Sequence, residues 1–361
     1  MPASFLADAY KQEQDAEKAA AFVDEYLSEE SLSGPILQEE ISSFFPIIAT
    51  DLAQTSMETT AGDHVERLKC LATALDKAGK NTIEGALSGP LGESAMGMTG
   101  TAQLVTTLAH DDAFSAAAGV LGAHNFTLRM LARKGVKAKA VCEHYIDKRL
   151  SDLLLDVFEF DHEELQGSIV ETVCIMHSLY ASESDTPLHL AEEGEVWALS
   201  PLPRLLVAHP QHLLFCSLLV GRLNESNDCT EELALFLLSL LSSEEGWGCF
   251  YSNDLAVAMD VLVRIVIDIS DDIDTLMPSD EKRRTGANTT YSNKKSRRRH
   301  QTLLLACTTI VQKGEKEIWQ RYASDLLHFL GDAEKDEKWD RASKVVAEKA
   351  LERVGQRLKL Q

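Results

Sequence analysis

The chain has 361 residues, of which 45% are hydrophobic and 6% aromatic, and its formal net charge at pH 7 is −22. That charge excludes nucleic acid and anionic membranes as electrostatic partners of the chain as a whole. A composition rich in leucine and alanine with few aromatic residues favours helix-on-helix packing over a β-sandwich.

Cysteine usage and the first residues indicate the cellular compartment. The seven cysteines are scattered, without a Cys-x-x-Cys pair, which is typical of reduced thiols in the cytosol. The first twenty residues lack the basic and apolar regions of a signal peptide, and no uncharged apolar stretch reaches the roughly 18 residues of a membrane span. We therefore expect a cytoplasmic protein without membrane insertion.

Apolar residues recur at spacings of three and four along most of the chain, which is the period of amphipathic helices. The predicted helices cover 4–27, 64–78, 123–134, 146–158, 163–180, 208–223, 229–243, 254–269, 301–313, 316–330 and 337–358. Short linkers favour antiparallel neighbours, and 89–102, rich in glycine, methionine, serine and threonine, is expected to be a loop. The sequence predicts an all-α fold, an armadillo/HEAT-like helical solenoid forming a single domain over 1–361. No clean repeat of 40–47 residues is visible, so a large helical bundle remains the alternative.

Motifs for covalent or metal chemistry are incomplete. The segment 76–82, DKAGKNT, lacks the first glycine and the hydroxyl residue of a phosphate-binding loop. Cys174 with His177, and His209 with His212, each give only two metal ligands on one helix face. We predict no catalytic residue, no metal and no cofactor.

The segment 248–270, GCFYSNDLAVAMDVLVRIVIDIS, has the clearest helix start in the chain. Ser252 or Asn253 can accept a hydrogen bond from the first N–H groups of a helix. Asp254 suits the positive end of the helix dipole. The residues that follow are apolar on nearly all sides, which predicts a helix buried by its neighbours.

Three charged residues interrupt this apolar segment. Asp260, Arg264 and Asp268 recur every four residues and therefore form one narrow stripe. Within the stripe, Arg264 can pair with both acids. The sequence predicts an interior helix that presents a single polar seam to water.

An isoprenoid synthase is the enzyme class that this region superficially resembles, because such enzymes hold magnesium diphosphate between two carboxylate-rich motifs. Here 253–260 and 271–274 supply acidic residues. Thr275, however, occupies the position of the last acid in the Asp-Asp-x-x-Asp motif that begins at 271. Both motifs also lie in one continuous segment, so they cannot face each other across a cavity. We reject this class.

Residues 280–300 form the most basic part of the chain, with no acid between 282 and 299. The basic residues are Lys282, Arg283, Arg284, Lys294, Lys295, Arg297, Arg298 and Arg299. We expect a flexible basic insert here, which is a solvated loop, a loop for an acidic partner or a bipartite nuclear import signal.

The segment 250–270 resembles the signature of the leucine-rich domain in the WISH/DIP family, the NCK-interacting proteins with an SH3 domain and their short fungal relatives. The matching residues are Phe250, Tyr251, Asn253, Asp254, Asp260, Arg264, Asp268 and Ser270. The next helix of the family is similar to SRRRHQTLLLACTTIV, with Thr302 in place of tyrosine, and weaker similarity lies at 68–98 and 170–190. The sequence contains no SH3 domain or proline-rich tract, as in the short relatives.

The resemblance implies an armadillo-like solenoid that binds the actin-related protein 2/3 complex, and so acts indirectly on actin. It implies activation of that complex to make unbranched filaments at cortical, endocytic actin patches, without covalent chemistry. The residues that we assign to partner binding are Asn253, Asp254, Asp260, Arg264, Lys338, Arg341 and Lys344. The alternative is a generic armadillo/HEAT-type adaptor that is nuclear through the basic insert.

Overall fold

The computed structural model of the chain is helical throughout the residues that it describes, and it has no strand among them. The described residues are 4–13, 15–28, 34–53, 60–89, 98–134, 136, 153–182, 193–225, 230–276, 288–335 and 341–359. The all-α prediction is confirmed. The chain divides into two compact units, Met1–Glu183 and Ser184–Gln361, and the single domain over 1–361 stays a prediction. No described helix is long and apolar enough to cross a membrane.

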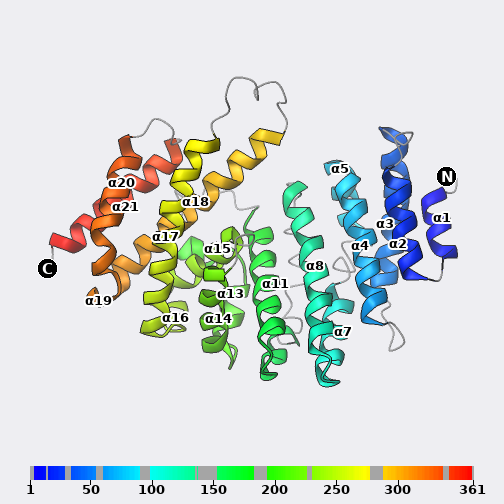
Figure 1. The fold of residues 1–361 in the computed structure, drawn as a ribbon, viewed down its shortest axis with the longest axis horizontal. Coiled ribbons are helices and arrows are strands. Elements are labelled where there is room, and N and C mark those ends of the chain that lie inside the picture. Colours follow the sequence, from blue (N-terminus) through cyan, green and yellow to red (C-terminus); the bar gives the residue numbers. More distant parts are fainter. Residues whose placement is uncertain are drawn as a thin grey trace. The chain divides into compact units, whose positions relative to one another are not determined.

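Unit 1 stacks its helices in two rows. Its elements are α1 (Phe5–Gln12), α2 (Ala16–Ser28), α3 (Pro35–Ala53), α4 (Ala61–Lys77), α5 (Lys80–Leu87), α7 (Met98–His110), α8 (Phe114–Lys134), the 3-10 turn η2 (Val157–Glu159) and α11 (Glu163–Ala181). Helices α2, α4, α8 and α11 follow one another, each packed on the next, and α1, α3 and α7 pack beside them (Figure 1).

Side chains of α3 fix the ends of its neighbours. Glu40 accepts hydrogen bonds from the Ser4 hydroxyl at 2.7 Å and the Leu6 N–H at 2.9 Å, so it anchors the first turn of α1. Gln38 accepts from the Gly79 N–H at 2.6 Å and so holds the start of α5. Free N–H groups at both helix starts are thereby satisfied from a neighbouring helix.

Three helix predictions in unit 1 differ from the structure. The predicted helix 4–27 is two helices, because Asp15 accepts the Glu17 and Lys18 N–H groups and starts α2 anew. Helix α3 was not predicted, because Gly34 and Pro46 interrupt its pattern, yet Pro46 lies inside the helix. Helix α7 begins at Met98, within the expected loop 89–102, and residues 90–97 lie outside the described part.

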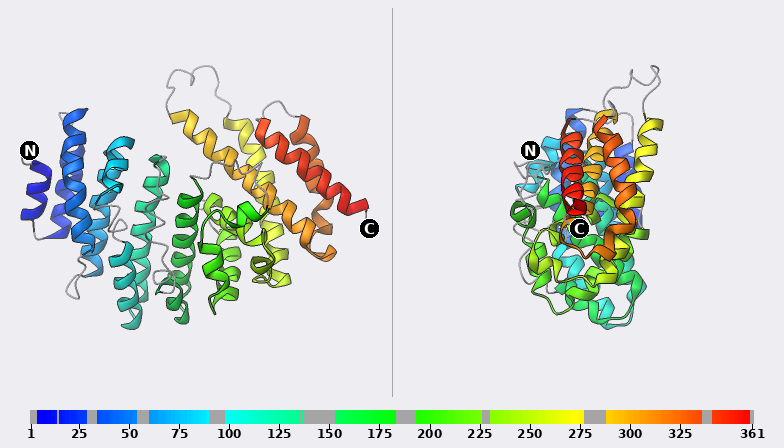
Figure 2. Two further views of the ribbon diagram at one scale, coloured as in Figure 1. Left: turned by 180° about the vertical axis from the view of Figure 1, so that it is seen from behind. Right: turned by 90° about the vertical axis from the view of Figure 1, so that its left-hand side faces the viewer.

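Unit 2 also stacks its helices in two rows, seen from behind in Figure 2. Its elements are α12 (Glu193–Trp197), α13 (Leu202–Val207), α14 (His212–Glu225), α15 (Thr230–Leu241), α16 (Glu244–Trp247), α17 (Ser252–Leu276), α18 (Asn288–Lys313), α19 (Lys316–Trp319), the 3-10 turn η4 (Gln320–Tyr322), α20 (Ala323–Lys335) and α21 (Arg341–Lys359). Helices α15, α18 and α21 pack in one series, and α14, α17 and α19 pack in the other.

Several hydrogen bonds between stacked helices join residues about 40 positions apart, whereas those between α4 and α8 and between α15 and α18 span 59 and 72 residues. In unit 1, Tyr10 bonds Asp51, 41 residues on, and Arg129 bonds Glu171, 42 residues on. In unit 2, Gln301 bonds Ser343, 42 residues on. Later residues of one helix bond later residues of the next, so stacked helices run parallel.

The helix that is buried on all sides is α15. Every residue from Glu231 to Ser243 is buried, and Phe236 packs on Phe215 of α14 with ring centroids 5.8 Å apart. Helix α17 was predicted to be an interior helix with one polar seam exposed, and the structure exposes Asp260 and Arg264 of that seam together with the apolar Val257 and Ile267. Helices α14, α18 and α19 pack on other sides of α17.

The basic insert also differs from the expected loop. Residues 288–300 form the first part of α18, whereas 277–287 lie outside the described residues. The run of lysine and arginine between 294 and 299 thus continues into the apolar helix that follows it without a break in the backbone.

Candidate functional site

The turn before α17 is built from α16. Ser243 caps α16 by accepting the Gly246 N–H at 2.8 Å. A Cβ at Gly246 would lie 2.3 Å from the Leu240 carbonyl oxygen, so only glycine permits α16 to fold against α15. The chain then reaches Tyr251, whose side chain is 56% exposed, and α17 begins at Ser252. The predicted helix 254–269 is confirmed and extends to Leu276.

Five exposed residues form a continuous stripe along α17. The α17 stripe consists of Asn253, Val257, Asp260, Arg264 and Ile267. Their spacings of four, three, four and three place them on one helix face. Val257 is 47% exposed and Ile267 is 37% exposed, so the stripe mixes apolar and charged side chains.

Helix α14 borders the stripe on one side. The Ser217 hydroxyl donates to Asp254 Oδ1 at 3.4 Å, and the Arg264 guanidinium donates to Asn224 Oδ1. Leu214 lies one turn before Ser217 on the same face of α14 and is 38% exposed. The exposed face therefore extends from α17 onto α14, and we call Leu214, Ser217, Asn224 and the α17 stripe together the α14–α17 surface.

The segment after α19 borders the stripe on its other side. The Tyr322 hydroxyl donates to Asp260 Oδ1 at 2.6 Å, and the Arg321 guanidinium lies 3.9 Å from the same oxygen. Arg321 also stacks over the Tyr322 ring, 4.5 Å from its centroid. Burial, reinforced by the hydrogen bond to Asp260, raises the pKa of Tyr322 to about 12. Tyr322 is therefore a neutral hydrogen-bond donor at physiological pH.

The expected pairing of Arg264 with Asp260 is not found in the described part of α17. Arg264 bonds Asn224 on α14, whereas Asp260 bonds Tyr322 and Arg321. Partners from neighbouring helices satisfy each charge, so the polar seam connects three elements instead of stabilising one helix. Asn224, Arg321 and Tyr322 were missed by sequence reasoning, because nothing local marks residues that meet a helix 40 or 62 positions away.

The residues predicted on the C-terminal helix are not brought to this surface. Lys338 lies outside the described residues, Arg341 is the first residue of α21, and Lys344 is half-exposed. Helix α21 packs on α18 and α20, and α18 is also the helix on which α17 packs. The two predicted groups therefore occupy separate helices, with α18 in contact with both.

The basic-insert residues can be placed only in part. Lys282, Arg283 and Arg284 lie outside the described residues, and Lys294, Lys295, Arg297, Arg298 and Arg299 belong to the backbone of α18.

Both carboxylate-rich motifs of the rejected synthase class belong to the single helix α17, so they do not face each other. Among the described side chains, no group of three His, Cys, Asp or Glu residues is arranged to hold a metal ion. The α14–α17 surface presents apolar and charged side chains to solvent.

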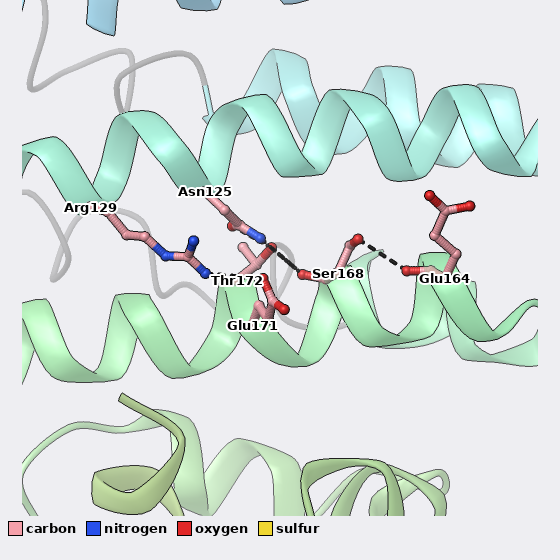
Figure 3. Close-up of polar contacts among 6 residues, drawn as sticks. All are labelled: Asn125, Arg129, Glu164, Ser168, Glu171 and Thr172. Atoms are coloured by element: carbon pink, nitrogen blue, oxygen red, sulfur yellow. Dashed lines mark hydrogen bonds and ion pairs between the residues drawn. The ribbon is translucent and has the colours of Figure 1, made fainter. Parts of the chain in front are cut away.

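A second polar cluster, which sequence reasoning also missed, links α8 and α11 in unit 1 (Figure 3). Thr172 donates to Asn125 Oδ1 at 2.8 Å, and Asn125 donates to the Ser168 carbonyl at 3.2 Å. One turn further, Arg129 pairs with Glu171 at 3.1 Å. Asn125 and Thr172 are buried, so the cluster fixes how the two helices align. The signal that could have revealed it is an asparagine at an otherwise apolar helix position.

Comparisons with known proteins leave the family open. No family model matches the chain, and no curated protein matches it. A crystal structure of an engineered protein is similar at a TM-score of 0.39, with 12% sequence identity over 83% of this chain and 97% of the other. A likeness of that size carries no argument about fold or function.

Proposed function

We propose that this chain is a non-catalytic, cytoplasmic protein that binds the actin-related protein 2/3 complex and activates it to nucleate unbranched actin filaments at cortical, endocytic sites. The observation that carries the proposal is the α14–α17 surface. The segment that resembles the WISH/DIP signature presents Asn253, Asp260 and Arg264 to solvent on one face, together with Val257 and Ile267. Exposed residues of a signature segment are better candidates for contact than for packing.

We further propose that the helices form an armadillo-like solenoid. Support comes from several hydrogen-bonded pairs on stacked helices whose residues are about 40 positions apart, which is close to the 40–47 residues of armadillo and HEAT repeats. The pair Asn224 and Arg264 has a separation of 40, and the pair Arg353 and Gln312 has one of 41. Parallel stacking within a row is what repeated helical hairpins produce.

Activation in this proposal is a shift of population. A saturating binder that prefers the filament-like arrangement of the complex over the splayed one multiplies the ratio of filament-like to splayed complex by its ratio of affinities. A preference of about 100-fold, or about 2.7 kcal/mol, moves a ratio of 1:99 to near equality. A surface already ordered by Ser217–Asp254 and Tyr322–Asp260 hydrogen bonds loses little entropy on docking.

The test is bulk actin polymerisation with purified actin-related protein 2/3 complex, without a nucleation-promoting peptide or filament seeds. We expect the full chain to shorten the lag, and Arg264→Glu to restore most of it. Arg204→Glu is the matched control, because Arg204 is an exposed arginine of the same unit, on α13 and outside the α14–α17 surface. An unchanged lag with the wild-type chain overturns the proposal.

The melting temperature separates contact from folding. Lost activity at an unchanged melting temperature assigns Arg264 to the contact surface, whereas a lowered melting temperature assigns it to stability. Fluorescent tagging tests the location: cortical spots coinciding with actin support the proposal. Nuclear accumulation that is lost on deletion of 282–299 supports the adaptor alternative instead.

A further inference from the structure

Four aromatic rings gather where α8 and α11 of unit 1 begin. The two helices run parallel, so their first turns lie at the same end of the pair (Figure 1). Phe160 packs edge-to-face on His110, with ring centroids 5.4 Å apart, and contacts Phe114 at 5.6 Å. Phe114 in turn stacks on His162 at 5.1 Å. His110 is exposed and the other three rings are half-buried, so part of the cluster faces solvent.

Hydrogen bonds fix the backbone of both segments that carry these rings. Helix α7 ends in a Schellman turn, in which the Ala113 N–H donates to the Leu108 carbonyl at 2.8 Å and Asp112 is left-handed, with a φ of 58°. The buried Gln166 side chain donates to the Phe160 carbonyl at 3.1 Å and so holds the segment before α11. The rings are therefore positioned before a partner binds, and docking orders little of the chain.

Acidic residues adjoin the rings on both segments. Two aspartates follow His110, and one acid lies on each side of Phe160. No lysine or arginine occurs in 98–128 or in 153–182, the stretches that supply the rings. The charge of the cluster therefore complements a cationic partner. All four acids are exposed, and we call the four rings and these acids together the aromatic corner: Asp111, Asp112, Glu159 and Asp161.

We propose that the aromatic corner is a docking site for an arginine-rich segment of a partner protein. A guanidinium is planar, stacks on aromatic rings and pairs with carboxylates through N–H groups of fixed geometry, so rings edged by acids suit it. A lysine ammonium satisfies the carboxylates but gains less from the rings, because it is a compact and strongly hydrated charge. The inference rests on the rings and the adjoining charges, independently of the proposed actin-related activity.

The net charge of −22 attracts any basic peptide, so the experiment separates the corner from the charge of the whole chain. The full chain is titrated into a fluorescent peptide of alternating arginine and glycine, and into the matching lysine peptide, at about 150 mM salt. Fluorescence anisotropy reports the two dissociation constants. We expect the arginine peptide to bind at least about threefold more tightly, because a guanidinium gains more from the rings. Equal dissociation constants, or no binding of the arginine peptide, overturn the proposal.

Asp112→Gly removes a carboxylate of the corner without disturbing its backbone, because a left-handed helix C-terminus favours glycine. Combined with Asp111→Asn, it should weaken binding of the arginine peptide by about tenfold, at a melting temperature no lower than that of the wild-type chain. The matched control is the double variant Asp24→Asn, Glu25→Gln, which removes two adjacent exposed acids of α2 and should change the affinity by less than about twofold. A similar loss of affinity in both double variants overturns the proposal.

Modification of histidine by diethyl pyrocarbonate tests the wild-type chain and does not depend on whether a variant folds. Saturating arginine peptide should slow the modification of His110 and leave that of His328, an exposed histidine of α20, unchanged. An unchanged rate at His110 overturns the proposal. Self-association of the chain that is lost in the Asp111 and Asp112 double variant, with peptide affinity retained, also overturns it, because the corner would then be an interface between copies.

Discussion

Helices α8 and α11 in unit 1 and helices α14 and α17 in unit 2 are stacked in the same way but joined differently. The helices of each pair run parallel and are joined by polar links, which are about one turn apart in α8–α11 and two to three turns apart in α14–α17. The α8–α11 links begin with Asn125 and Thr172, which are both buried. In the other pair, Asn224 and Arg264 are both exposed.

The difference indicates which polar links determine how two helices align and which leave their polar groups accessible at the surface. A buried link between Asn125 and Thr172 must be satisfied when the helices pack, so it specifies one alignment. In the α14–α17 pair the described polar links are exposed or half-buried, and Phe215 of α14 packs on Phe236 of α15 beneath it. Its polar groups remain at the surface and are available to another molecule.

The largest expected effect tests the apolar layer beneath α14 and α17. Phe236→Ala should destabilise unit 2 by about 3–5 kcal/mol, because it removes a fully buried ring and leaves a cavity. The measurement is urea unfolding followed by tryptophan fluorescence, which reports on unit 2 alone. All four tryptophans lie there, at Trp197, Trp247, Trp319 and Trp339.

The control for that variant is Val257→Ala, on the exposed α17 stripe. It should change the unfolding free energy by less than about 0.5 kcal/mol. A similar decrease in the unfolding free energy for both variants would mean that α17 is as enclosed as α15. The exposed α17 stripe would then not exist as described.

The second effect tests the buried polar groups of unit 1 through pH. His64 is fully buried, with Nε2 3.0 Å from the Thr101 hydroxyl. Burial, with a smaller effect of the nearby Arg67 charge, lowers the pKa of His64 from 6.5 to about 4. Below pH 6.5 the unfolded chain therefore binds a proton that the folded chain excludes. The contribution of His64 to the free energy of unfolding is fully present above pH 6.5, and it decreases by about 3 kcal/mol as the pH drops to 4.

The measurement is urea unfolding followed by circular dichroism between pH 7 and pH 4, on the wild-type chain and on His64→Gln. The variant should lose less stability over this interval, because the histidine that binds the extra proton is gone. Equal slopes for the two proteins would contradict the assignment. If the two units unfold separately, the unfolding of unit 2, followed by tryptophan fluorescence, should depend on pH in the same way in the variant and in the wild-type chain.

The third effect tests the buried link between α8 and α11. Thr172→Val keeps the shape of the side chain but removes the hydroxyl that donates to Asn125 Oδ1. Leaving a buried polar group without that donor should cost about 1–3 kcal/mol, measured by circular dichroism in urea. The double variant Asn125→Leu, Thr172→Val should recover part of the loss. A single variant with wild-type stability would show that the link does not determine alignment.

Local chemistry explains which parts of the fold were predictable. The apolar period of three and four located α4 and α11 to within three residues at each end and the start of α17 to within two, whereas α17 continues seven residues beyond its predicted end. Helix α3 was missed, since Pro46 reads as a helix breaker although the neighbouring α1, α4 and α5 hold that helix.

The candidate site was predictable only within one helix. Asp260 and Arg264 were recognised, with Asp268, as one stripe from their spacing, and the structure exposes both. The side chain of Asp268 lies outside the described part. Their partners could not be predicted, because Asn224 and Tyr322 approach through tertiary packing. Exposure of Val257 was also unpredictable, since hydropathy alone does not reveal which side of a helix lacks a neighbour.

The smallest expected effect concerns the exposed link between α14 and α17. Arg264→Ala and Asn224→Ala should each lower the stability of unit 2 by less than about 0.5 kcal/mol, and the double variant should show a coupling below about 1 kcal/mol. Water replaces the lost hydrogen bond at an exposed position, whereas no water reaches the buried Asn125–Thr172 link. The measurement is urea unfolding by tryptophan fluorescence on the single and double variants. A coupling as large as the cost of Thr172→Val would mean that Arg264 aligns the helices, and it would then no longer be available to a partner.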